Sequence, residues 1–175
     1  MNVALYVLAL IIFLTAYMLF RTYKLSKFPH PAAMVEKPDI DQKTVSTHLA
    51  ELIRFKSIST ESSVGFDPQP FLDIHQWIGN TFPLLTKNLE KTCINQYSLL
   101  YVWKGSDPKL MPVLFNAHLD VVPVDESTLP DWKVEPFGGV IREGYIWGRG
   151  AIDMKSHATG LLEAVEALIR SGYQP

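Results

Sequence analysis

The hydrophobic pattern of the chain begins with an unbroken apolar run over residues 3–20, which contains no charge, proline or glycine. As a helix, a run of this length would be about 27 Å long, close to the hydrocarbon thickness of a bilayer. The alternative is a cleaved signal peptide, but the start is uncharged and no small-residue cleavage site follows the run. We therefore predict a single transmembrane anchor over residues 1–24, followed by a proline-rich linker over residues 25–40.

Apolar residues return at helical spacing after the linker. Asp41 is a plausible N-cap for a helix that runs to Phe55, and residues 69–80 form a second stretch with an apolar stripe. A third and longer helix is predicted to begin near Met154 and to end before Gly172. We expect these helices to cover a core.

The pattern between these helices is typical of strands. Residues 97–105 and 112–118 are short runs rich in β-branched and aromatic residues, and the second run is apolar at successive positions, as in a strand covered on both faces. Residues 139–148 predict a hairpin that turns at Glu143 and Gly144. The sequence thus predicts an α/β fold, a mixed sheet with flanking helices, over residues 41–175.

Charge and cysteine content narrow the classes of function. The chain has 16 basic and 18 acidic residues, and three of the basic ones directly follow the apolar run, which leaves the remainder at about −5 with no basic cluster. Nucleic acid is therefore not expected as a partner. Cys93 is the single cysteine, so an internal disulfide is excluded.

Three polar residues are candidates for chemistry. His118 and Asp120 are two positions apart at the end of a predicted strand, so their side chains would share a face, and Asp153 precedes the long helix, whose dipole favours an anion there. A crevice at the carboxyl ends of strands commonly holds a ligand, and an imidazole with carboxylates suits a divalent metal. Asp120 could orient His118. The alternative is an ordinary strand-end histidine and a helix N-cap aspartate without metal.

The amino-acid sequence around these residues indicates a protein family more specifically than their spacing does. The segment HLDVVP at residues 118–123, then Trp132 and the pair PF at 136–137, then GYIWGRGAIDMK at 144–155, resemble two signatures of the zinc metallopeptidases. That family includes aminoacylase, acetylornithine deacetylase, succinyl-diaminopimelate desuccinylase and carboxypeptidase S. The resemblance extends from about Thr44 to residue 175 and is strongest to the branch of carboxypeptidase S and N-fatty-acyl-amino-acid synthase/hydrolase.

The resemblance implies roles for the three candidates. His118 matches a ligand of one zinc ion, Asp120 matches the active-site acid that orients this histidine, and Asp153 matches the carboxylate that bridges two zinc ions. It further implies that the peptide bond after Asp153 is cis, and that Arg149 and Lys155 support the turn. The implied fold is the N-terminal portion of a zinc-peptidase catalytic domain, with the general-base glutamate and remaining ligands beyond residue 175.

The implied function is hydrolysis of amide or peptide bonds in N-acyl amino acids or short peptides by a membrane-anchored, dinuclear-zinc enzyme. The resemblance also allows a homodimer of the full-length protein. The 175 residues alone are expected to be inactive. The alternative is a truncated, non-catalytic α/β binding domain tethered to a membrane. The resemblance favours a lumenal, vacuolar or extracellular catalytic side, whereas the basic residues Arg21, Lys24 and Lys27 favour a cytosolic flank.

Other conspicuous side chains are given structural roles. His30, His48 and His75 are expected to be structural or solvated, and His157 is expected on a helix surface or behind the site. Trp103 and Trp147 are expected to pack in the core.

Overall fold

The computed structural model describes residues 3–26, 40–60 and 65–175. The chain divides into two units, Met1–Lys37 and Pro38–Pro175, and each is considered by itself. Most of the predicted linker, with its prolines and His30, lies outside the described residues.

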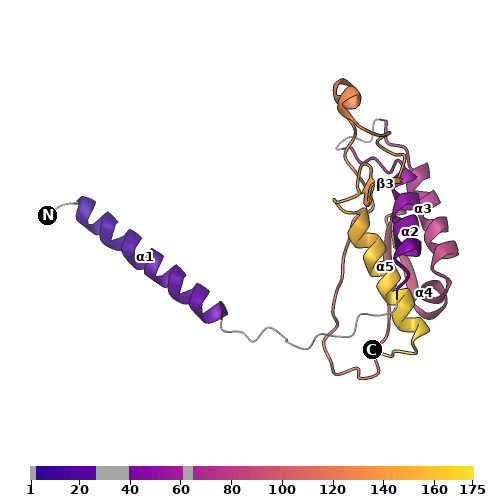
Figure 1. Cartoon of the computed structure of the whole chain (residues 1–175). Coiled ribbons are helices and arrows are strands. Elements are labelled where there is room, and N and C mark those ends of the chain that lie inside the picture. The colour runs from indigo at the N-terminus through magenta and orange to yellow at the C-terminus, as the bar shows by residue number, and fades with distance from the viewer. Residues whose placement is uncertain (1–2, 27–39, 61–64) are drawn as a thin grey trace. The chain divides into compact units, whose positions relative to one another are not determined.

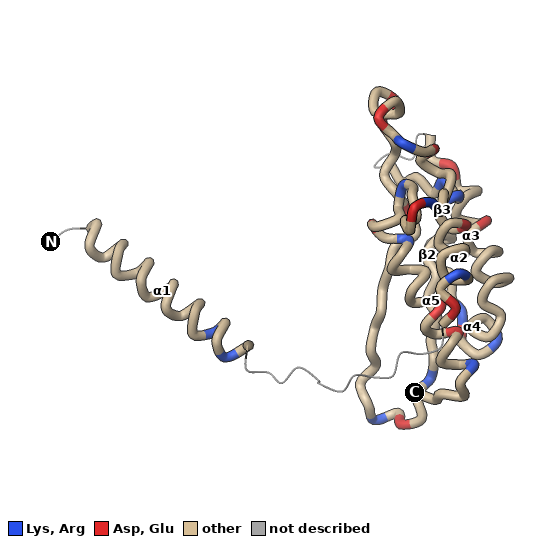
Figure 2. The backbone as a smooth tube through the Cα atoms, in the orientation of Figure 1, with Lys and Arg blue, Asp and Glu red and all other residues tan. Residues whose placement is uncertain are grey.

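The first unit contains helix α1, Val3–Ser26, which covers residues 3–24 of the predicted anchor. All of its described residues are exposed, and Figure 2 shows it free of charge except near its C-terminal end, where Lys24 lies in the last turn. An apolar surface around the whole circumference suits a lipid environment. By length and composition α1 could be a membrane span or a signal sequence.

Three predicted helices are present in the second unit. Helix α2, Gln42–Arg54, is capped by Asp41, whose carboxylate accepts hydrogen bonds from the backbone N–H groups of Lys43 (3.1 Å) and Thr44 (3.2 Å). Helix α3 is Gln69–Thr81 and helix α5 is Lys155–Arg170. After α5 the chain turns at Gly172 (φ 78°), whose N–H donates to Ile169 O at 3.0 Å, as predicted.

The core lies between these helices and a short helix that was not predicted, α4, Pro83–Asn88. Figure 1 shows α5 beside α2. Glu166 of α5 is buried, and its carboxylate accepts hydrogen bonds from the N–H groups of Leu84 (3.1 Å) and Leu85 (2.8 Å) at the start of α4. The core residues are Leu52, Ile74, Ile78, Phe82, Leu85 and Ala158.

The strands form two antiparallel pairs. Strand β2, Ser98–Val102, lies within the predicted run and pairs with β1, Glu90–Ile94, which was not predicted. Strands β3, Val140–Arg142, and β4, Tyr145–Trp147, form the predicted hairpin, with Glu143 and Gly144 both at positive φ (56° and 78°) as a two-residue hairpin turn requires. Residues Glu126–Asp131 form a 3-10 helix, η1.

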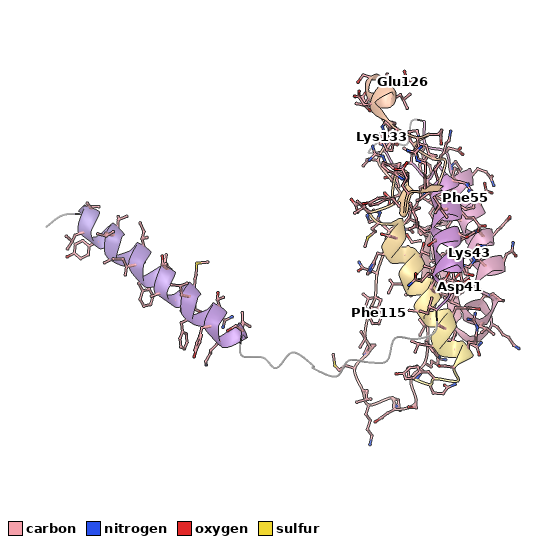
Figure 3. The ribbon with its side chains drawn as sticks, viewed as in Figure 1. Asp41, Lys43, Phe55, Phe115, Glu126 and Lys133 are labelled. Carbon is pink, nitrogen blue, oxygen red and sulfur yellow. The ribbon has the colours of Figure 1, made fainter. Side chains whose placement is uncertain are left out.

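The predicted strand at residues 112–118 is wrong: the chain is extended there but pairs with no neighbour. Val113, Leu114 and Phe115 are 77 %, 80 % and 71 % exposed, and Figure 3 shows Phe115 on a segment that runs apart from the helices. An apolar run becomes a strand only where neighbours bond its backbone and cover its faces. Instead of a mixed sheet, the described residues contain two antiparallel pairs and one parallel bridge, Ile58 with Val121.

Candidate metal centre

Residues 118–121 are held in place by the segment 57–59, which follows α2. The N–H of Val121 donates to Ser57 O (2.8 Å), the N–H of Ser59 donates to Val121 O (3.1 Å), and the hydroxyl of Ser57 donates to Leu119 O (2.6 Å). Ser57 and Val121 are buried. The backbone of His118 and Asp120 is therefore fixed from one side by a strand-like contact between two segments that are about 60 residues apart in sequence.

A glycine-containing turn presents Asp153 from the other side. Gly150 has a φ of 87°, and a Cβ at this position would lie 2.7 Å from a methyl group of Val121, so the turn approaches the His118 segment closely. The Asp153–Met154 peptide bond is cis, as the resemblance implies. Met154 occupies the N-cap position of α5 and there is no side-chain cap, so the alternative role of Asp153 as an N-cap is wrong.

The structure brings all three predicted residues together. The Nε2 atom of His118 is 3.0 Å from Oδ1 of Asp153, and its Nδ1 atom is 3.0 Å from the backbone O and 3.3 Å from Oδ1 of Asp120. The side chains of His118, Asp120 and Asp153 are 45 %, 39 % and 86 % exposed. The centre is therefore open to solvent and to a ligand.

The hydrogen-bonding pattern defines what the centre can accept. The backbone O and Oδ1 of Asp120, which lie near Nδ1 of His118, are both acceptors, so this side of the ring favours a proton on Nδ1. A neutral ring then presents a lone pair on Nε2, which faces the carboxylate of Asp153. Two acceptors at 3.0 Å are stable only with positive charge between them, supplied by a second proton on the ring or by a metal cation. His118 and Asp153 thus fit a cation as two neighbouring donors, with Asp120 fixing the tautomer.

The protonation of His118 follows the same pattern. Partial burial lowers its pKa, but hydrogen bonds to Asp120 and Asp153 and the negative charges of both carboxylates outweigh this and hold the pKa above its ordinary value. The acidic surroundings therefore stabilise positive charge at this position.

A cleft of about 430 Å³ opens beside the three residues. Its walls include Trp132, Trp147 and Arg149, and the guanidinium of Arg149 lies 5.5 Å from the ring centroid of Trp132. Trp147 therefore lines the cleft.

Among the residues the structure describes, no group of three or more His, Cys, Asp or Glu side chains is arranged to hold a metal ion.

Lys155 supports the turn that carries Asp153. Its side chain is fully buried, and Nζ donates hydrogen bonds to the backbone O atoms of Leu52 (3.0 Å) and Phe55 (2.7 Å) at the end of α2. Burial lowers the pKa of Lys155 to about 8. His157, which lies four residues after Asp153, is exposed on the surface of α5.

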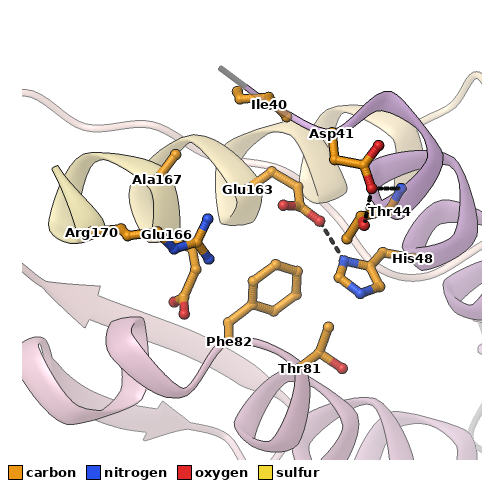
Figure 4. Close-up of a pocket in the computed structure, with 10 residues that line it drawn as sticks. All are labelled: Ile40, Asp41, Thr44, His48, Thr81, Phe82, Glu163, Glu166, Ala167 and Arg170. Carbon is orange, nitrogen blue, oxygen red and sulfur yellow. Dashed lines mark hydrogen bonds and ion pairs between the residues drawn. The ribbon is translucent and has the colours of Figure 1, made fainter. Parts of the chain in front are cut away.

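A second pocket lies between α2 and α5 (Figure 4). His48 of α2 forms a hydrogen bond with Glu163 of α5, and its ring packs edge-on against Phe82. His75 contacts the backbone O of Tyr97 through Nε2 at 2.9 Å. Both histidines therefore join elements of the fold, as expected for structural residues.

One residue of the centre was missed by the sequence analysis. The hydroxyl of Ser59 donates a hydrogen bond to Oδ2 of Asp120 at 2.5 Å. No motif or periodicity marks this serine, because its proximity to Asp120 depends on the bridge between Ile58 and Val121.

Comparison with known proteins gives a match to one family. Residues 114–175 match peptidase family M20/M25/M40. This segment contains His118, Asp120 and Asp153 together with the turn between them.

Individual relatives extend the similarity towards the N-terminus. The chain is 42 % identical over 133 residues to a probable carboxypeptidase S-like protein of Dictyostelium discoideum, covering 75 % of this chain and 25 % of the relative. It is 42 % identical over 107 residues to carboxypeptidase S of Saccharomyces cerevisiae (60 % and 19 %) and 37 % identical over 118 residues to the human N-fatty-acyl-amino acid synthase/hydrolase (66 % and 23 %). The chain spans about a quarter or less of these relatives. The chain is therefore similar to peptidase family M20/M25/M40, and residues 114–175 are the part that matches it.

Proposed function

We propose that the protein is a membrane-anchored dinuclear zinc hydrolase that cleaves amide or peptide bonds of N-acyl amino acids or short peptides. The observation that carries this proposal is the approach of His118 and Asp153 to 3.0 Å from positions 35 residues apart. The names of the relatives, carboxypeptidase S and N-fatty-acyl-amino acid synthase/hydrolase, support the substrate class.

The proposed roles follow from the contacts. His118 offers Nε2 to a metal while Asp120 accepts its Nδ1 proton and fixes the ring, and Asp153 offers its exposed carboxylate. Zinc, when bound, supplies the Lewis acidity that activates water and polarises an amide carbonyl.

The cleft supports binding of a substrate with both apolar and charged parts. Trp132 and Trp147 contribute large apolar rings to the lining of the cleft, and Arg149, whose guanidinium lies over the ring of Trp132, adds a permanent positive charge with which a carboxylate of an amino acid could pair. Asp120 and Asp153 line the same cleft and disfavour an anionic group beside them.

The test is the zinc content and hydrolytic activity of the full protein with His118→Ala and Asp153→Ala. Both variants are expected to lose bound zinc and to hydrolyse an N-acyl amino acid at least about 100-fold more slowly. His157→Ala is the matched control, because it removes an exposed imidazole on the adjacent helix and should keep both properties. Unchanged zinc and activity in both site variants would refute the assignment.

A further inference from the structure

We propose that Ser59 is a positioning residue of the metal centre, which holds Asp120 so that Asp120 in turn orients His118. This inference rests on the proposed function only for its metal-binding part. Ser59 is joined to the Asp120 carboxylate by a hydrogen bond, and His118 is joined to Asp120 by a hydrogen bond to its backbone O (3.0 Å) and by an ion pair with Oδ1 (3.3 Å).

The two oxygens of the Asp120 carboxylate have different partners. Oδ2 accepts a hydrogen bond from the hydroxyl of Ser59, with 2.5 Å between Oγ and Oδ2, and Oδ1 lies 3.3 Å from Nδ1 of His118. Because one oxygen is held by Ser59, rotation of the carboxylate is restricted and the other oxygen stays directed at the imidazole. The ring then keeps Nε2 directed at Asp153, 3.0 Å away.

The backbone of Ser59 is itself fixed. Its N–H donates to Val121 O (3.1 Å), and the preceding residue, Ile58, forms the parallel bridge with Val121. Two residues earlier, Ser57 is fully buried, and both its backbone O and its hydroxyl bind the segment 119–121. The hydroxyl of Ser59 therefore projects from a rigid segment, as a positioning group requires.

A purely structural role does not account for the contact equally well. The side chain of Asp120 is 39 % exposed, so water can replace the hydroxyl as a hydrogen-bond donor and loss of Ser59 leaves no buried carboxylate unsatisfied. Water does not impose the same direction on the carboxylate. Removing the hydroxyl should therefore disturb orientation more than folding.

The experiment compares Ser59→Ala, Ser59→Thr and the control Ser46→Ala in the full protein. Thr keeps a hydroxyl and suits extended backbone. Ser46 is partly exposed, and its hydroxyl donates to Gln42 O of its own helix (2.7 Å). Two readouts are used: the tautomer of His118 in metal-free protein, from the nitrogen shifts of its ring, and zinc affinity, from competition with a chromogenic chelator.

We expect Ser59→Ala to reduce the share of the Nδ1–H form and to weaken zinc binding about tenfold, with a melting temperature close to that of the parent. Ser59→Thr should restore both readouts, and Ser46→Ala should change neither. An unchanged tautomer and affinity in Ser59→Ala, or equal defects in the Ala and Thr variants, would overturn the proposal. If the parent protein binds no zinc, the proposed function fails, and the tautomer measurement still decides the role of Ser59.

Discussion

Tyr101 shows how a single polar atom affects the stability of this protein. Its hydroxyl is buried and has no hydrogen-bond partner among the described residues, and its ring packs against the core. A buried hydroxyl without a partner costs free energy, and burial raises the pKa of Tyr101 because the phenolate is disfavoured. The residue therefore contributes packing at the expense of an unsatisfied donor.

We expect Tyr101→Phe to raise the free energy of unfolding by about 1 kcal/mol at neutral pH. The variant should also alter the alkaline limb of the stability profile. A folded pKa above the unfolded value gives stability that is present below pH 10 and is lost as pH rises through the folded pKa, and Phe removes this term. Urea unfolding at pH 7 to 11 measures both effects, and a lower stability of the variant at pH 7 would contradict the expectation.

Gly139 is restricted by a close backbone contact. It has a φ of 56°, and a Cβ at this position would lie 2.0 Å from the backbone O of Ala50 in α2. We expect Gly139→Ala to destabilise the protein by at least about 3 kcal/mol, since backbone strain and a steric clash add together. Gly144→Ala is the control, because Gly144 has a similar φ of 78° with open space around it, and should cost only about 1 kcal/mol. Equal losses of stability in the two variants would show that the clash is relieved.

At the scale of elements, Lys155 joins the start of α5 to the end of α2. Its Nζ atom donates to the backbone O of Leu52 and to the backbone O of Phe55, the C-cap residue of α2. Lys155→Met keeps the length of the side chain but removes both hydrogen bonds. We expect it to lower the free energy of unfolding by about 2 kcal/mol. Lys87→Met, at an exposed position of α4, serves as the control for loss of charge, and an equal effect in both would exclude a specific role.

Helices and the hairpin could be predicted because their signals are local. The stripe of α2 and the cap at Asp41 are visible within one short segment, and Glu143 with Gly144 specifies the turn between β3 and β4. The predicted strand at residues 112–118 was wrong because strand pairing depends on residues that are distant in the sequence. Strand β1 was missed because its residues are all exposed and carry no alternation of burial.

The same distinction holds for the centre. His118, Asp120 and Asp153 were predicted from ordered motifs close to one another in the chain. Ser59 was not, because a bridge across about 60 residues brings it to Asp120. A hydroxyl that acts through tertiary contact has no signature in a single sequence.

At the scale of the whole molecule, we propose that α1 anchors the protein in a membrane. We expect Ile11→Arg combined with Leu14→Arg to release the protein from membranes, since each arginine at the centre of a span costs about 2.5 to 3.5 kcal/mol. The fraction that pellets after alkaline carbonate extraction measures this. Ile11→Leu with Leu14→Ile keeps the apolar surface and should pellet like the parent. Detection of a mature N-terminus after Phe20 would instead identify α1 as a cleaved signal.

The orientation of the protein in the membrane is a separate question. We propose that residues 41–175 lie on the lumenal or extracellular side, as the family resemblance implies, although Arg21, Lys24 and Lys27 favour the opposite orientation. Protease treatment of sealed microsomes should leave this segment intact. Complete digestion without detergent would place it in the cytosol.

The extended segment at residues 110–115 has a consequence for the expression of residues 41–175 by themselves. Leu110, Met111 and the three apolar residues that follow Pro112 are each at least 71 % exposed. An exposed apolar segment whose backbone N–H and C=O groups are unpaired promotes aggregation between copies of the chain. When residues 41–175 are expressed by themselves, the soluble yield should therefore fall steeply with concentration, and holdase chaperones that recognise apolar peptides should co-purify unless a polar substitution such as Leu114→Lys is introduced.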